Sequence, residues 1–275
     1  METGLTEMLV KKARNGILPW SEQAALVQAT GLSLREVEAA ALQLGIIPAH
    51  YSSNQGAISI TEQLKLLNSR AAVIGCGGLG GYVIEQLARL GVGEIQAWDG
   101  DVFEEKNLNR QLFAQIPTMG KSKVLSAAAR VEATNPAVQL IGYAHPFKGT
   151  EDAKRLKGAA VVIDALDNIP SRLLLARVCK ELQIPLVHGA IDGWYGQVIT
   201  QFPDESTVEQ IYAHYRAGQD EPVKPPALSF VPAVIASLEV AQALKVILGR
   251  GDLRRGQLLA VDLLSMDIDT LEIGS

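Results

Sequence analysis

The side chains that could perform chemistry in this sequence lie between residues 75 and 172. A glycine-rich segment comes first, Gly75-Cys76-Gly77-Gly78-Leu79-Gly80-Gly81. Four further groups follow it: Asp99-Gly100-Asp101, then Asn107-Leu108-Asn109-Arg110-Gln111, then Lys123 in a G-x-x-K pattern, and finally Asp164-Ala165-Leu166-Asp167-Asn168 with Arg172. A backbone that can approach phosphate is thus combined with two cations and with carboxylates that can hold a hard metal ion. This combination indicates chemistry on a nucleotide.

The glycine-rich segment contains G-x-G-x-x-G between a predicted strand and a predicted helix. Gly75, Gly77, Gly78 and Gly80 allow a tight turn and let backbone N–H groups approach phosphate oxygens. Nineteen residues after Gly80, Asp99 ends the next predicted strand, where a carboxylate commonly accepts hydrogen bonds from ribose hydroxyls. These features predict a bound nucleotide. Taken alone they favour NAD over ATP, and a glycine turn without a ligand is the remaining alternative.

Arg110, Lys123 and Asp167 favour ATP. When a carboxylate attacks the α-phosphate of ATP, negative charge builds on the phosphoryl oxygens and on the departing pyrophosphate, and cations already in place stabilise that charge. Arg110 offers a fork of donors and Lys123 a point charge. Asp167, at the C-terminal end of its predicted strand, could hold a Mg²⁺ ion that bridges phosphates. A nicotinamide site needs no such array.

Each of these residues also has a structural explanation. Arg110 could pair with Glu104 or Glu105 at the surface, and Lys123 could be a solvated charge on a helix. Asn107 and Asn109 could shape a turn. Asp164 lies deeper in its strand than Asp167, which favours a structural role.

Four other residues in the second half of the chain invite interpretation. For His188, at a strand end, a half-buried histidine with satisfied hydrogen bonds is favoured over a catalytic one. Trp194 and Tyr195 are expected to pack at the edge of a groove. Cys179, in an apolar helix, is expected to be an inert core residue.

Alternating strands and helices must position these side chains. The segment 70–75 is an apolar run typical of a buried parallel strand. The other expected strands are 94–98, 159–163, 185–188, 197–202, 257–262 and 268–273, and the expected helices are 61–67, 82–90, 171–182 and 229–248. The order predicts an α/β fold with a Rossmann-like, doubly wound, mostly parallel sheet that is continued by antiparallel strands.

Two regions stand apart from this alternation. Residues 1–50 predict a small helical module with helices over 21–29 and 33–44, the second begun by a capping box of Ser33 and Glu36. We expect this module to serve docking or dimer packing, and residues 51–275 to form the nucleotide-binding domain. The segment 203–232 is rich in proline and is expected to be a long crossing loop.

Taken together, the motifs G-x-G-G-L-G, D-x-D…N-L-N-R-Q, G-x-x-K and D-x-x-D-N-x-x-x-R resemble those of the ubiquitin-activating-type superfamily. Within it, the sequence is most similar to the bacterial MoeB/ThiF/HesA adenylyltransferases, over roughly residues 50 to 270. The resemblance implies a nucleotide site that includes the glycines, Asp101 and Asn168, and it gives Gln111 no role. It implies phosphates at Gly78 and its neighbours and at Lys123, ribose at Asp99, the triphosphate at Asn107 and Arg110, and Mg²⁺ at Asp167.

The function implied by this resemblance is ATP-dependent adenylylation of a small ubiquitin-like sulfur-carrier protein. The carboxylate of the carrier's C-terminal Gly-Gly would be activated with release of pyrophosphate, by an enzyme that forms a homodimer. Other readings are the same ATP chemistry on a tRNA base or a peptide, an NAD(P)-dependent oxidoreductase, and a non-catalytic scaffold of the same fold.

The sequence also departs from the family pattern. Many relatives bind zinc through two CxxC pairs, but this chain has two cysteines, Cys76 and Cys179, so zinc is not expected. The segment 201–229 contains no cysteine, which argues against a covalent second step. The segment 50–54, His-Tyr-Ser-Ser-Asn, stands where relatives have Arg-Tyr-x-Arg, so both arginines are replaced. The resemblance implies that the second arginine would reach the ATP of the partner subunit, so Ser53 removes a cation there, and Arg14 and Arg35 are candidate substitutes.

Bulk composition excludes several classes of protein. With a formal net charge of -5 and a pI near 5.5, the chain lacks the clustered cations of a nucleic-acid-binding surface. Residues 1–14 do not form a signal peptide, and no run of 18 uncharged apolar residues predicts a membrane span. A cytoplasmic protein without nucleic-acid or membrane partners is expected.

Overall fold

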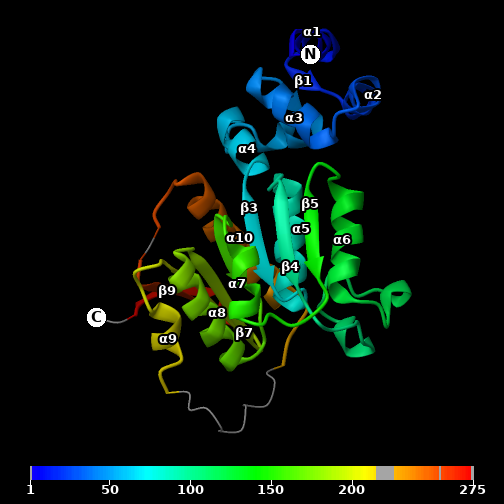
Figure 1. Ribbon diagram of the computed structural model, residues 1–275. Helices are drawn as coiled ribbons and strands as arrows, with labels where there is room; N and C mark the ends of the chain where they lie inside the picture. Colours follow the sequence, from blue (N-terminus) through cyan, green and yellow to red (C-terminus); the bar gives the residue numbers. More distant parts are fainter. Residues whose placement is uncertain (1, 215–225, 254, 274–275) are drawn as a thin grey trace.

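A computed structural model describes residues 2–214, 226–253 and 255–273 (Figure 1). Over these residues an eight-stranded sheet has the order β10-β9-β8-β7-β6-β3-β4-β5. Its parallel strands are β3 (Arg70–Ile74), β4 (Glu94–Trp98), β5 (Gln139–Tyr143), β6 (Val161–Asp164) and β7 (Leu186–Asp192), and its antiparallel strands are β8 (Tyr195–Gln201), β9 (Gln257–Asp262) and β10 (Asp267–Glu272). The predicted fold class is confirmed.

The two faces of the sheet bury separate apolar clusters. Along β3, Val73 belongs to one cluster, and its neighbours Ala72 and Ile74 belong to the other, as the alternation of strand side chains requires. The first cluster is covered by α5 (Gly78–Leu90), α6 (Lys123–Thr134) and α10 (Phe230–Leu248), and the second by α7 (Thr150–Leu156), α8 (Ile169–Leu182) and α9 (Thr207–Ile211). Both faces are therefore covered, which explains the continuous apolar runs of the parallel strands.

The N-terminal module contains the two predicted helices and some elements that were not predicted. Its elements are α1 (Glu2–Lys12), α2 (Trp20–Thr30), α3 (Leu34–Gln43) and a short parallel pair, β1 (Ile17–Leu18) with β2 (Ile47–Pro48). Ser33 begins α3 with the predicted capping box. Leu9, Leu18 and Leu26 are among the buried residues of the module's own small core.

The module rests on the sheet domain at the amino ends of the parallel strands (Figure 1). Leu42 of α3 forms a buried cluster with Leu67 and Ala137 of the sheet domain. Arg35 donates a hydrogen bond from Nη1 to the carbonyl of Gly93, just before β4, at 3.2 Å. Buried contacts thus join the module to the sheet domain on either side of residue 50.

Several elements differ from their predicted forms. Strand β5 and helices α6 and α7 were not predicted. Strand β5 has an irregular apolar pattern, and its residues are partly or fully exposed. The segment 203–232 contains α9 and the first turn of α10, and its central residues 215–225 lie outside the described part of the chain.

Helix α10 corrects the prediction that no segment could span a membrane. Among the described residues, this 19-residue helix is the one that is long and apolar enough to cross a membrane, judged by length and composition alone. The helix instead contributes Val231, Ile235 and Val240 to the core and contacts α5, β7 and β8. Its apolar character is that of a core helix.

Candidate functional site

The predicted site residues follow three adjacent strands. The glycine turn follows β3, Asp99 follows β4, and Asp167 follows β6, and these strands are neighbours in the sheet order β6-β3-β4. Because all three are parallel, their carboxyl ends lie at one edge of the sheet, where open α/β sheets bind ligands.

Two of the glycines are required by the close packing of the turn. Gly75 has a φ of +103°, and a Cβ there would lie 2.5 Å from the carbonyl oxygen of Ala165. A Cβ on Gly80 would lie 1.8 Å from the carbonyl oxygen of Gly75. The turn can therefore pack against the end of β6 only if both positions lack a side chain.

The other two glycines are not required by packing. A Cβ on Gly77 would lie 3.5 Å from Nε2 of Gln111, and one on Gly78 would lie 3.7 Å from Cβ of Pro232, which are ordinary contacts. Helix α5 begins at Gly78, and no described side chain caps its N-terminus. The backbone N–H groups of the first turn of α5 therefore have no side-chain acceptor, and no side chain on Gly77 or Gly78 blocks access to them. This arrangement suits phosphate oxygens.

Asp99 is joined to the glycine turn by hydrogen bonds. Its Oδ2 accepts from the backbone N–H of Cys76 at 2.8 Å, and its Oδ1 accepts from the N–H of Asp101 at 2.8 Å. Burial raises the pKa of Asp99, and these two donors and the charge of Lys123 oppose that rise. The carboxylate is therefore fixed at the mouth of the turn, with lone pairs left for a ribose hydroxyl.

Lys123 is not the solvated charge that the sequence left open. It is the first residue of α6, its side chain is 9% exposed, and Nζ donates to Oδ2 of Asp101 at 2.9 Å. The Asp101 side chain is 74% exposed. A buried ammonium group is thus held beside the glycine turn by a carboxylate that can move into solvent.

Arg110 is held within its own turn. Nη1 donates to the carbonyl of Lys106 at 2.9 Å and to Oδ1 of Asn109 at 3.0 Å. Of the two glutamates considered as partners, Glu104 forms an ion pair with Lys106 instead. The structure brings Lys123 to Asp99 and Asp101, but it shows no contact of Arg110 with them among the described residues.

The two asparagines of this segment shape the local structure, as the alternative reading allowed. Oδ1 of Asn107, which is buried, accepts from the N–H of Glu104 at 2.9 Å. Nδ2 of Asn109 donates to the carbonyl of Ala227 at 3.0 Å and so joins the turn to the chain before α10. Asn107 can still offer its amide nitrogen to a ligand.

Gln111 belongs to the N-L-N-R-Q motif but has no predicted role. It is buried beside Gly77, and its Oε1 has no hydrogen-bond partner among the described residues. A buried acceptor without a donor is costly, so a ligand or water with a donor group would stabilise this position. Its place at the end of N-L-N-R-Q is the only sign of this in the sequence.

The loop after β6 carries the predicted metal ligand. Asp164 ends the strand, fully buried, and accepts from the N–H of Leu166, while Asn168 caps α8 through the N–H of Ser171 at 3.0 Å. Asp167 lies between them, and the Asn168 amide approaches it at 3.5 Å. The structure therefore gives Asp164 and Asn168 structural contacts.

Within the described residues, no group of three or more His, Cys, Asp or Glu side chains is placed to hold a metal ion. Mg²⁺ itself usually binds through one or two carboxylates and the phosphates of its nucleotide. Asp167 fits that donor set.

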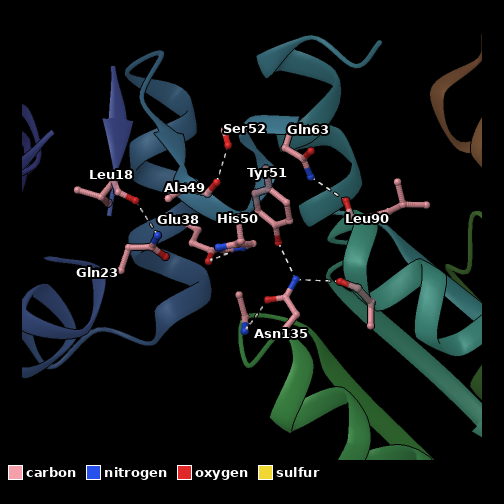
Figure 2. Close-up of polar contacts among 12 residues, drawn as sticks. Leu18, Gln23, Glu38, Ala49, His50, Tyr51, Ser52, Gln63, Leu90 and Asn135 are labelled. Carbon is pink, nitrogen blue, oxygen red and sulfur yellow. Dashed lines mark hydrogen bonds and ion pairs between the residues drawn. The ribbon is translucent and has the colours of Figure 1, made fainter. Parts of the chain in front are cut away.

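The segment 49–54 forms a short 3₁₀ helix between the module and the sheet domain (Figure 2). The Tyr51 hydroxyl accepts from Nδ2 of Asn135 at 2.9 Å, and Nε2 of His50 lies 3.3 Å from Oε1 of the buried Glu38. Tyr51 also packs against Gly91, before β4. The segment therefore lies at the amino ends of the strands, away from the site of its own chain.

Arg35, one of the proposed substitutes for the missing arginines, lies at the same amino end through its bond to Gly93. Arg14 lies in the module, where its backbone bridges to Ile17. Both residues therefore lie away from the site of their own chain, and a substitution for the missing arginine at the site of a partner subunit stays a prediction.

Both cysteines are buried, and burial raises the pKa of each thiol. His188 differs from its prediction in one respect, because it is fully rather than half buried; both ring nitrogens have partners, as expected. Trp194 and Tyr195 are 40% and 50% exposed. The Trp194 ring packs 5.1 Å from that of Phe230, and Tyr195 lines a groove with Gln197, as expected of residues at the edge of a groove.

The fold defines the chain as a Rossmann-like α/β protein, and the predicted site residues lie at the edge where such sheets bind ligands. The model of the ThiF family matches residues 51–275, and the chain belongs to that family. It is accordingly an adenylyltransferase, because its relatives bear that activity in their names.

Similar proteins include the SAMP-activating enzyme E1 of Haloferax volcanii, 36% identical over 76% of this chain and 78% of the relative. The sulfur carrier protein adenylyltransferase of Thermus thermophilus is 33% identical over 77% of this chain and 81% of the relative. The crystal structure of E. coli MccB with ATP has a TM-score of 0.69 over 98% of this chain and 88% of that chain, at 19% identity, and shows the shared fold.

Proposed function

We propose that this adenylyltransferase uses ATP and Mg²⁺ to activate the C-terminal glycine carboxylate of a ubiquitin-like sulfur-carrier protein. The observation that carries the proposal is the burial of Lys123 next to Asp99, beside a glycine turn whose Gly78 has room for a ligand. The names of the Haloferax and Thermus relatives supply the class of substrate.

Each residue at the edge has a task in this reaction. N–H groups around Gly77 and Gly78 would hold phosphate oxygens, and Asp99 would accept a ribose hydroxyl. Lys123 would exchange Asp101 for a phosphate and offset the charge that develops in the transition state. Asp167 would bind Mg²⁺, which neutralises the phosphates when bound. Asn107 and Gln111 would complete the pocket.

The chemical step needs no general base. The carrier carboxylate is ionised at pH 7, so its oxygen can attack the α-phosphorus directly. A new C–O–P bond forms, the bond from the α-phosphorus to the bridging oxygen breaks, and pyrophosphate leaves. The product is an acyl-adenylate, from which a sulfur donor would later displace AMP. Arg110 would have to leave its own turn to reach the phosphates.

The partners follow from the same chemistry. A tail that ends in Gly-Gly is narrow enough to enter a crowded site, and a folded β-grasp body would remain outside it. We propose that the enzyme works as a homodimer in the cytoplasm. Ser53, at the position of the relatives' second arginine, would bring no cation to the site of the other subunit.

The experiment is ATP–pyrophosphate exchange in the presence of candidate carriers, with Mg²⁺. A carrier ending in Gly-Gly should support exchange, and the same carrier without its last glycine should not. Exchange that is independent of any carrier, or absent with all Gly-Gly-ended carriers encoded beside this chain, would refute the proposal. Binding of NAD(P) with no binding of ATP would point to an oxidoreductase instead.

A further inference from the structure

A buried chain of hydrogen bonds runs from the end of β6 to the end of α9. Oδ2 of Asp164 lies 2.8 Å from Nδ1 of His188, its register partner on β7. Nε2 of His188 lies 3.1 Å from the hydroxyl of Tyr212, and the two rings pack edge to face. Asp164 and His188 are fully buried, so these contacts are made without solvent.

Arg172 links Tyr212 to the loop after β6 and so closes the series of hydrogen bonds into a ring. Its Nη1 donates to the Tyr212 hydroxyl at 2.5 Å, and its Nη2 and Nε donate to the carbonyl of Leu166 at 2.6 and 3.2 Å. The N–H of Leu166 donates to Oδ1 of Asp164 at 3.0 Å. Both polar groups of Leu166 are therefore held by one closed ring, and the next residue along the chain is Asp167.

The directions of the hydrogen bonds are mutually consistent around the ring. Arg172 has only donors and Asp164, when ionised, has only acceptors. Burial lowers the pKa of His188 and raises that of Tyr212, so the imidazole is neutral and the hydroxyl keeps its proton. Nδ1–H then donates to Asp164, Nε2 accepts from the Tyr212 O–H, and the Tyr212 oxygen accepts from Arg172. One tautomer of His188 satisfies every partner.

We infer that Tyr212 and His188 are positioning residues for Asp167, acting through the ring that fixes both polar groups of Leu166. The inference rests on the proposed function, in which Asp167 binds Mg²⁺. Tyr212 joins the loop to α9, and without its hydroxyl both the Arg172 guanidinium and the His188 imidazole lose a partner. The loop before Asp167 then has more than one arrangement available, and metal affinity falls as it does when outer-shell partners of ligands are removed.

The test is the substitution Tyr212→Phe, which keeps the ring packing and removes the hydroxyl. Mn²⁺, as a paramagnetic substitute for Mg²⁺, is titrated against the enzyme with a non-hydrolysable ATP analogue, and free Mn²⁺ is followed by electron paramagnetic resonance. We expect the dissociation constant for Mn²⁺ to rise by about tenfold. In exchange assays the Mg²⁺ concentration for half-maximal rate should rise equally, with the KM for the carrier unchanged.

Tyr51→Phe is the matched control, because it also removes a buried hydroxyl with a hydrogen bond, at the other end of the sheet. It should lower the melting temperature and leave Mn²⁺ binding unchanged. His188→Gln serves as the second variant, and its effect on Mn²⁺ binding should not add to that of Tyr212→Phe, since both break one ring.

Three outcomes would overturn the inference: wild-type Mn²⁺ binding in Tyr212→Phe, an equal loss in Tyr51→Phe, or additive effects of Tyr212→Phe and His188→Gln. Failure of the proposed function is seen separately, as absent exchange in the wild-type enzyme. The Mn²⁺ titration does not need a carrier, so it decides the inference in either case.

Discussion

The ammonium group of Lys123 lies 2.9 Å from Oδ2 of Asp101, and the lysine side chain is 9% exposed whereas the aspartate is 74% exposed. The cation is thus fixed and its counter-charge is free to turn into water. A phosphate that enters the site can replace the carboxylate without any displacement of α6. Substitution of Lys123 should therefore affect the chemical step more than the fold.

For Lys123→Met we expect carrier-dependent pyrophosphate exchange to fall by about 10²-fold or more, because a charge placed for the transition state is lost. Methionine keeps the apolar length of the side chain, so the melting temperature should change little. Exchange kinetics and thermal unfolding measure the two effects. A variant with normal exchange would place the phosphates elsewhere.

Arg110→Ala and Asp167→Ala should each lower exchange by at least ~10²-fold. The two variants should differ in kind, since Asp167→Ala removes a ligand for Mg²⁺ and Arg110→Ala a donor to the triphosphate. Raised Mg²⁺ should partly restore only Asp167→Ala. Circular dichroism checks that both remain folded. If both retain wild-type rates, the reaction takes place outside this edge.

Two glycine substitutions should separate folding from nucleotide binding. In Gly80→Ala the methyl group would lie 1.8 Å from the carbonyl of Gly75, so we expect a loss of about 3 kcal/mol or more in the free energy of unfolding. In Gly78→Ala the nearest contact is 3.7 Å, so the fold should persist. ATP binding should weaken by about tenfold, because the added methyl group would keep a phosphate oxygen from the backbone N–H groups, at a cost similar to that of one lost hydrogen bond to a charged group.

Urea unfolding and calorimetric titration with ATP measure these two effects. Equal stability in both variants would contradict the packing argument for the turn. Unchanged ATP binding in Gly78→Ala would contradict the proposal that the phosphates bind at the start of α5.

A pH dependence of stability is expected from the junction shown in Figure 2. Burial raises the pKa of Glu38 to about 8 and lowers that of His50 to about 4. Between about pH 4.5 and 8 the unfolded chain releases the Glu38 proton while the folded chain keeps it, so the stability contributed by this group falls as pH rises, by up to about 5 kcal/mol. His50 has the opposite effect. Below about pH 6.5 the unfolded chain binds a proton at His50 while the folded chain does not, so the stability contributed by this group falls as pH falls toward 4.

Glu38→Gln should remove the decline between pH 5 and 8, because the amide is neutral throughout. Urea unfolding at both pH values measures it, and Glu7→Gln, at an exposed position of α1, is the control. A wild-type slope in Glu38→Gln would show that the carboxyl group is ionised in the folded protein.

The glycine turn and the strands around it could be predicted because their signals are local. Gly75 must accept a positive φ, and the apolar runs of β3 and β6 follow from burial on both faces. The motif order also placed Asp99 and Lys123 near one edge. That Lys123 is buried could not be read from the sequence, because its burial depends on the approach of the Asp99–Asp101 turn to α6.

The ring around Leu166 could not be predicted either. Asp164 and His188 meet through strand register, and Tyr212 comes from a short helix whose position depends on packing against α8. The same holds for Gln111, whose unpaired oxygen is visible only once the glycine turn is folded beside it. Long-range geometry of this kind leaves no periodic trace in the residues themselves.

The seat of the N-terminal module has a practical consequence. Leu42 shields Leu67 and Ala137 from water. A protein shortened to residues 51–275, the part that matches the family, would therefore expose an apolar surface where the helices had packed. The shortened protein should therefore aggregate more readily than the 275-residue chain. Tags and reporters are better attached to the 275-residue chain at helix α1, which lies in the N-terminal module, away from the glycine turn.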